Sequence, residues 1–144
     1  MAATKLLSDP AHTALLLVDI QPDFMPKGPL ATVDGDAIVP GVRGLMEQSP
    51  CGLVVATQDW HPAGHVSFAS THPGREPFES IELHGHDQTL WPDHCVQGTA
   101  GAELAPELPW ERADLILRKG CEPQVDSYSG FRNNWGPDGT RPPT

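Results

Sequence analysis

The sequence predicts an α/β fold in which a parallel β-sheet is flanked by helices, and three short apolar segments carry this prediction. They are ALLLVDI (14–20), GLVVATQD (52–59) and ADLILRKG (113–120). Each has the length and the continuous Val, Ile and Leu content of a strand that is buried on both faces, as the strands of parallel sheets are. A buried helical turn is the alternative for each segment, and we favour the sheet.

The segment between the first two predicted strands, 33–50, has the pattern of a helix. An aspartate, Asp34 or Asp36, stands near its start, as is typical of helix N-termini. Its apolar residues recur at spacings close to one helical face. These residues are Ile38, Val39, Val42, Leu45 and Met46. The pattern predicts a strand–helix–strand unit.

The segment between the second and third predicted strands, 60–112, is dominated by His, Pro, Gly and Trp. This composition predicts a long excursion from the sheet, with one short helix in GAELAPEL (101–108). A loop of this length in a compact domain is usually functional, so we expect part of the site to lie in it.

The length of 144 residues predicts one domain, residues 1–144. Its last segment, RNNWGPDGTRPPT (132–144), has no apolar periodicity. Three strands are also few for a sheet of this class. We therefore expect a single domain that is incomplete at its C-terminus.

The acidic composition argues against several kinds of partner. The chain has 9 Lys and Arg against 19 Asp and Glu, a net charge of -10, whereas nucleic-acid binding needs clustered basic residues. No apolar stretch approaches the roughly 20 residues that span a bilayer. The 3 cysteines form no CxxC pair, and without a secretory signal they predict reduced thiols. We expect a soluble, cytoplasmic protein that binds neither nucleic acid nor membrane.

Each predicted strand delivers a charged residue near its carboxyl end: Asp19, Asp59 and Lys119. Ligands of open parallel sheets bind outside these ends, so we expect the three residues on one rim. A single charge of this kind is ordinarily a solvated surface residue, but three on one rim favour a site. Asp19 and Lys119 could form a buried pair that supplies an acid and a base, with an ordinary structural ion pair as the alternative.

Asp59 and His61 are the best candidates for metal ligands. Two residues apart in extended chain, their side chains point the same way, about 6.5 to 7 Å apart at the backbone. Such a pair favours zinc, manganese or iron, with a third protein ligand. The candidates for the third ligand are His65, His72, His84, His86 and His94. We prefer His94, because Trp91 and Pro92 could shield it from water. The alternative is that these histidines only populate a polar loop.

No cysteine has the sequence context of a nucleophile. Cys121 comes two residues after Lys119, and Cys95 directly follows His94. Neither cysteine lies between an apolar strand and a helical pattern, where a helix N-terminus could lower a thiol pKa. We therefore favour ordinary free thiols at both positions.

Four motifs occur in a fixed order and cover residues 11–131. They are LLLVDIQPDF (15–24), VVATQDWHPAGHVSFAS (54–70), LWPDHCVQGTAGAEL (90–104) and LRKGCEPQVDSYSGF (117–131). Together they resemble the nicotinamidases, of pyrazinamidase type, in the isochorismatase-like cysteine hydrolase superfamily. The resemblance implies a Rossmann-like fold of three layers. It also implies hydrolysis of nicotinamide to nicotinate and ammonia, a step of NAD salvage and pyridine nucleotide biosynthesis.

The resemblance further implies roles for individual residues. Asp19 matches the family's catalytic aspartate, and Lys119 matches its catalytic lysine. Phe24 and Trp91 match the aromatic residues that sandwich the pyridine ring of the substrate.

The metal ligands are implied in the same way. Asp59, His61 and His94 match the family's ligands to a divalent metal ion, with zinc as first choice and manganese or iron as alternatives. His65 matches a position that supplies an extra ligand in some members. The segments QDWHP and WPDHC are not expected in the isochorismatase branch, so they favour the amidase.

One part of the family pattern is not matched. The family's nucleophile is a cysteine at a strand-to-helix junction, in a segment resembling GLATDYC, and neither Cys95 nor Cys121 aligns with it. We therefore expect little amidase activity from these 144 residues. An inactive protein that binds metal and pyridine is the alternative. A third hypothesis is a hydrolase in which Asp19 activates a metal-bound water without a thiol. The question of a homo-oligomer stays open.

Overall fold

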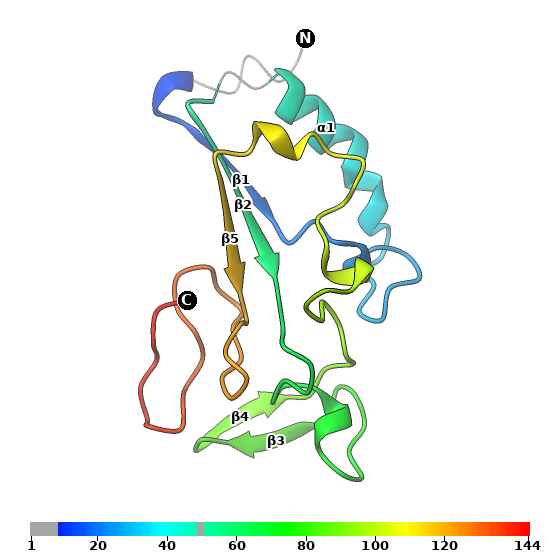
Figure 1. The fold of residues 1–144 in the computed structure, drawn as a ribbon, viewed down its shortest axis with the longest axis vertical. Helices are drawn as coiled ribbons and strands as arrows, with labels where there is room; N and C mark the ends of the chain where they lie inside the picture. The colour runs from blue at the N-terminus through cyan, green and yellow to red at the C-terminus, as the bar shows by residue number, and fades with distance from the viewer. Residues whose placement is uncertain (1–8, 49–50) are drawn as a thin grey trace.

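The central sheet consists of three parallel strands, as the sequence predicts. The computed structural model describes residues 9–48 and 51–144. Within them, β1 (Ala14–Val18), β2 (Leu53–Asp59) and β5 (Leu115–Lys119) pair in the order β1-β2-β5 (Figure 1). The three predicted segments are confirmed as strands, each shorter than predicted by one to three residues.

The register of the strands brings their carboxyl ends to one edge of the sheet. Val18 lies opposite Thr57, and Asp59 lies opposite Lys119. Because all three strands run the same way, the residues that follow them emerge side by side. This edge is where the sequence predicts a site.

One α-helix, α1 (Val39–Gln48), connects β1 to β2, and it confirms the strand–helix–strand prediction. It begins later than predicted, because a 3-10 turn (Gly35–Ile38) precedes it. Asp34 before that turn has a φ of 52° and makes no side-chain cap. Pro40 suits the first helical turn, where its missing N–H costs nothing. In the part of the chain that the structure describes, no helix is long and apolar enough to cross a membrane.

The hydrophobic core lies against one face of the sheet. Strand side chains alternate between faces, so Leu17 and Ala56 point into the core, while Leu16 and Val18, 53% and 58% exposed, lie on the other face. Met46 of α1 is buried against the covered face. The buried core residues are Leu17, Ile20, Met46, Val54, Ala56, Ala105 and Leu108.

The prediction of helices on both faces holds for one face only within the described residues. The prediction of a short helix in 101–108 is wrong, because a 3-10 turn (Ala100–Ala102) is followed there by irregular chain. Pro106 explains this, because it disfavours helical backbone at Ala105 and lacks an N–H. Ala105 and Leu108 pack directly into the core instead.

The excursion between β2 and β5 contains an antiparallel hairpin that the sequence analysis did not predict. Its strands are β3 (Ser80–Leu83) and β4 (His86–Thr89). The two turn residues, His84 and Gly85, both have positive φ, 53° and 80°, as two-residue hairpin turns require. Figure 1 shows this hairpin beyond the carboxyl ends of the parallel strands. It therefore borders the candidate site.

Candidate metal centre and its surroundings

The charged residues at the strand ends meet in one cluster. Nζ of Lys119 lies 2.9 Å from Oδ1 of Asp59 and 3.0 Å from Oδ2 of Asp19. Asp59 and Lys119 are buried. Their contact follows from the register, in which they are direct partners across β2 and β5. The three predicted strand-end charges therefore share one site.

Asp19 is held in an uncommon backbone conformation. Its φ is 51°, in the left-handed region that an aspartate tolerates better than most residues. Thr57 on the neighbouring strand fixes it twice: the Thr57 hydroxyl donates to Oδ1 of Asp19 at 2.6 Å, and the Thr57 carbonyl accepts the Asp19 N–H at 3.2 Å. The carboxylate is thus aimed before any ligand arrives.

Asp59 and Lys119 stabilise one another in the charged form. Burial alone would raise the pKa of Asp59, since a buried carboxylate loses its hydration. Hydrogen bonds from His61 and His94, with the charge of Lys119, outweigh burial and hold this pKa well below its ordinary value. Burial alone would lower the pKa of Lys119, but Asp59 and Asp19 raise it. Asp59 and Lys119 are therefore both charged at neutral pH.

Asp59 also belongs to a group of three side chains that could hold a metal ion, Asp59, His61 and His94, which we call the metal group. Oδ2 of Asp59 lies 3.2 Å from Nε2 of His61 and 3.5 Å from Nε2 of His94. Nδ1 of His61 lies 3.0 Å from the carbonyl oxygen of Gly120, and Nδ1 of His94 lies 2.8 Å from that of Pro92. A carbonyl only accepts, so each Nδ1 carries a proton and each Nε2 can hold a proton or a metal ion.

The chemistry of these donors fits a divalent metal ion. The ligand atoms of Asp59, His61 and His94 lie within 4.8 Å of one another, and all three residues are buried. One carboxylate and two imidazoles suit zinc, manganese or iron. Histidines anchored by carbonyl oxygens through the second nitrogen are typical of metal ligands. Oδ1 of Asp59 accepts no hydrogen bond among the described residues and faces only the Lys119 ammonium.

Gly120 allows the backbone to approach the His61 ring. Its φ is 68°, and a Cβ at this position would stand 2.5 Å from Cε1 and 2.7 Å from Nδ1 of His61. The same Cβ would lie 3.1 Å from Oδ1 of Asp59. A glycine directly after β5 is therefore required for the carbonyl that anchors His61.

His65 lies next to the metal group, but its ring nitrogens already have protein partners. Its ring is 4.3 Å from that of His61. Nδ1 lies 2.8 Å from the hydroxyl of Ser67, and Nε2 lies 3.3 Å from the carbonyl oxygen of Val125. Burial and the neighbouring His61 lower its pKa to about 4, so the ring is neutral at neutral pH. Its assignment as an extra ligand stays a prediction.

The other candidate histidines are engaged elsewhere. Nε2 of His72 lies 2.8 Å from the Val66 carbonyl oxygen, and Nε2 of His84 lies 2.9 Å from that of Gln124. His86 stacks on Trp135, with ring centroids 4.4 Å apart. Among the five candidates for a third ligand, the structure brings His94 to Asp59 and His61.

Gln21 is a buried residue of this site that the sequence analysis missed. Its Nε2 donates to the carbonyl oxygens of Asp59 and Ala102, both at 2.8 Å, and its Oε1 accepts the Asp59 N–H at 2.7 Å. The amide thus joins the segment after β1 to the end of β2 and orients Asp59. The signal was present, because a polar residue follows the buried strand end in DIQPDF.

The two aromatic residues that the resemblance implies for ring binding, Phe24 and Trp91, have different surroundings in the structure. The ring of Phe24 meets that of His94 edge on at 5.7 Å. Trp91 meets the ring of Tyr128 at 6.2 Å and 89° and donates its indole N–H to the Tyr128 hydroxyl at 3.2 Å. Tyr128 was not singled out from the sequence, although it is the only tyrosine of the chain. A ring sandwich between Phe24 and Trp91 stays a prediction.

The two thiols near the site are not activated. Cys95 is buried, and burial together with the charges of Asp59 and Asp23 raises its pKa far above the ordinary value. Cys121 is exposed at its surface, and partial burial still raises its pKa. Since the thiolate is the nucleophile, neither cysteine suits covalent catalysis.

Comparison with known proteins identifies relatives along most of the chain. No protein-family model matches it. The nicotinamidase of Acinetobacter baylyi is 50% identical over 121 residues, and that of Escherichia coli is 50% identical over 123 residues. These matches cover 83% and 84% of this chain, but 55% and 57% of the relatives. The chain thus spans just over half the length of the curated relatives it matches.

Solved structures agree with the sequence matches. A nicotinamidase/pyrazinamidase of Acinetobacter baumanii superposes with a TM-score of 0.80 at 48% identity, over 92% of this chain and 61% of that one. Yeast nicotinamidase bound to the inhibitor nicotinaldehyde gives 0.78 at 30% identity, covering 83% and 62%. The pyrazinamidase of Pyrococcus horikoshii in complex with zinc gives 0.62 at 41% identity, covering 82% and 57%. An isochorismatase-like hydrolase of Alkaliphilus metalliredigens, at 24% identity and 0.54, shares the fold. The chain is a homologue of nicotinamidases and pyrazinamidases across just over half of their length.

Proposed function

We propose that this chain forms the metal-binding and ring-binding part of an amidohydrolase that converts nicotinamide to nicotinate and ammonia. The observation that carries the proposal is the sharing of Asp59 between two groups. Its Oδ1 faces Lys119, which also holds Asp19, and its Oδ2 faces His61 and His94. The Asp19–Lys119 pair and the metal group are therefore connected by the Asp59 carboxylate. The similarity to nicotinamidases supports the choice of substrate.

Asp59, His61 and His94 would hold the divalent metal ion. The carbonyl oxygens behind both imidazoles support this role, and so does the zinc in the Pyrococcus horikoshii homologue. When bound, the ion would supply a Lewis-acid contact for the pyridine nitrogen. His65 could join as a further ligand if it released the Val125 carbonyl oxygen.

Asp19 and Lys119 would handle protons at the carboxamide. The ammonium of Lys119 orients the Asp19 carboxylate, so that Asp19 can accept a proton from an attacking group. A cavity of about 370 Å³ opens beside Asp19 and Phe24. Phe24 is proposed as one wall for the planar ring, because its ring meets that of His94, and Trp91 is proposed as the other.

An alternative function is binding of metal and a pyridine ring without turnover. The raised thiol pKa values of Cys95 and Cys121 favour it, because neither residue offers a thiolate. We therefore expect the 144-residue chain to bind nicotinamide and to release little ammonia from it. A thiol-independent hydrolase with Asp19 as base predicts instead that activity survives replacement of all three cysteines by serine.

Calorimetry on the metal-free and zinc-loaded chain tests the proposal. Nicotinamide should bind only the zinc-loaded form, and benzamide, which has the carboxamide but no ring nitrogen, should bind much more weakly. His61→Ala should abolish both zinc and nicotinamide binding, while His72→Ala, at a histidine outside the group, should not. Nicotinamide binding without ammonia release supports the binding function. Equal affinity for nicotinamide and benzamide, or no zinc binding, contradicts the proposal.

A further inference from the structure

The hydroxyl of Tyr128 lies near the side chains of Trp91, Gln88 and Asp126. Nε1 of Trp91 donates to it at 3.2 Å, and Nε2 of Gln88 donates to it at 3.1 Å. Burial and the charge of Asp126 raise the pKa of Tyr128 to about 12. A phenol oxygen has two lone pairs, and the two donors occupy both. These two hydrogen bonds hold the hydroxyl oxygen in place.

Asp126 and Gln88 stand behind this hydroxyl, and both are buried. Nε2 of Gln88 lies 2.7 Å from Oδ2 of Asp126, and the backbone N–H of Ser127 donates to Oδ1 at 2.8 Å. Asp126 also approaches the metal group, since its carboxylate lies within 4.8 Å of ring nitrogens of His61 and His65. It thus connects the metal group to the aromatic residues.

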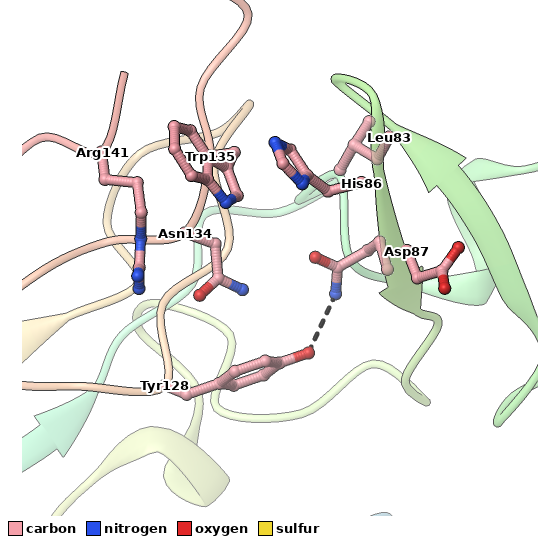
Figure 2. A pocket seen from close by; sticks show the side chains of 8 residues that line it. Leu83, His86, Asp87, Tyr128, Asn134, Trp135 and Arg141 are labelled. Carbon is pink, nitrogen blue, oxygen red and sulfur yellow. Dashed lines mark hydrogen bonds between the residues drawn. The ribbon is translucent and has the colours of Figure 1, made fainter. Parts of the chain in front are cut away.

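Trp91 also meets the ring of Phe78 edge on at 6.1 Å, whereas no ring contact besides that with Trp91 is found for Tyr128 among the described residues. Tyr128 is 58% exposed, and it meets Trp91 at a right angle rather than in a stack. Figure 2 shows Tyr128 at the border of a cavity of about 350 Å³, which is lined by residues of β4 and of the C-terminal segment. Since the ring has open space on that side, hydrogen bonds rather than packing set its orientation.

We propose that Asp126 and Gln88 are positioning residues that hold Trp91 and Tyr128 as a rigid right-angled corner beside the metal group. The inference rests on the proposed function in taking Trp91 as a wall for the pyridine ring. Neither positioning residue touches the ring, and both act through the Tyr128 hydroxyl. An indole fixed by its own N–H loses no orientational freedom when a planar ligand arrives, so the ligand binds more tightly.

Two variants and one matched control test this role on the 144-residue chain. Gln88→Leu removes the donor, and Asp126→Asn removes the charge with little change of shape. Asp87→Asn, at the exposed neighbour of Gln88 on β4, makes the same charge change outside the network. The rate at which the Trp91 indole proton exchanges with solvent is measured by NMR, with Trp91→Phe used to assign its signal. This rate shows whether the indole N–H stays hydrogen-bonded when no ligand is present. Nicotinamide and zinc affinities are measured on the same proteins.

We expect each network variant to speed indole exchange and to weaken nicotinamide binding by about tenfold, the scale of one lost buried hydrogen bond. Asp87→Asn should change neither, and Gln88→Leu should leave zinc affinity unchanged. Gln88→Leu and Tyr128→Phe together should weaken binding by less than the sum of the two single effects, because both remove the Gln88–Tyr128 hydrogen bond, while Gln88→Leu also removes the contact with Asp126.

Unchanged indole exchange in Gln88→Leu would overturn the inference, as would additive effects in the double variant. A parallel loss of zinc affinity in Gln88→Leu would show a general structural role and also overturn it. If exchange responds as expected but the unaltered chain does not bind nicotinamide, the proposed function fails while the positioning of Trp91 stands. Gln88→Leu keeps the test decisive if Asp126→Asn fails to fold.

Discussion

The ammonium of Lys119 lies 2.9 Å from Oδ1 of Asp59, and both groups are almost completely buried. A buried ion pair of this kind is costly to break from one side, because the remaining charge keeps its burial and loses its partner. Lys119 also holds Asp19 at 3.0 Å, so one cation serves carboxylates from two strands. Its removal would leave two acidic groups facing each other.

We predict that Lys119→Met destabilises the metal-free chain by about 3 to 5 kcal/mol, the usual cost of breaking a buried pair. Urea unfolding followed by circular dichroism measures the change. Arg112→Met, at an exposed basic residue just before β5, is the control and should cost less than about 0.5 kcal/mol. Equal effects of the two substitutions would show that the Lys119 pairs contribute nothing to stability.

His94→Ala should lower zinc affinity by about a hundredfold or more, since a directly ligating imidazole exceeds the tenfold to hundredfold effect of outer contacts. His84→Ala is the matched control, because His84 bonds the Gln124 carbonyl oxygen and not the metal group. Competition with a chromogenic chelator gives both affinities. Retention of zinc affinity in His94→Ala would remove His94 from the ligand set.

Gly120→Ala should damage both folding and metal binding. The new methyl group would overlap the His61 ring, and alanine disfavours a φ of 68°. Gly85→Ala separates these causes, because Gly85 has a φ of 80° but open space around it. We expect Gly85→Ala to cost about 1 kcal/mol through φ alone, and Gly120→Ala to cost about 1 to 3 kcal/mol more through overlap. Similar unfolding midpoints for the two variants would contradict the overlap.

Tyr128 gives a pH prediction that absorbance can read directly, because it is the only tyrosine. Burial and the charge of Asp126 raise its pKa to about 12 from an ordinary 10.0. The unfolded chain therefore loses this proton first as the pH rises, so stability falls between these two values. Phenolate absorbance should rise near pH 12 in the folded chain and nearer the ordinary value in Asp126→Asn. A normal titration midpoint in the unaltered chain would contradict an effect of burial and the Asp126 charge on Tyr128.

The sequence by itself determined the parallel strands and the charged residues at their ends. A short continuous apolar segment is most easily accommodated as a buried strand. Parallel strands bring the residues at their carboxyl ends to one edge of the sheet, whatever the side chains are. Asp19, Asp59 and Lys119 were therefore predictable as neighbours. The candidate metal pair at 59 and 61 followed from the two-residue period of extended chain, and His94 was preferred because of Trp91 and Pro92 before the resemblance implied the same residue.

Only the tertiary structure decided which loop groups complete the site. Gln21, Tyr128 and Asp126 act through hydrogen bonds to residues 37 to 81 positions away, and no local period encodes such contacts. The hairpin β3–β4 and the 3-10 turn at Ala100–Ala102 were unpredictable for a similar reason. Gly85 and Pro106 restrict the backbone locally, but packing against the rest of the fold decides which segments come together. A strand can be recognised from the local sequence because its apolar residues form a regular pattern. The shape of a polar loop depends instead on individual hydrogen bonds to distant residues, which leave no such pattern.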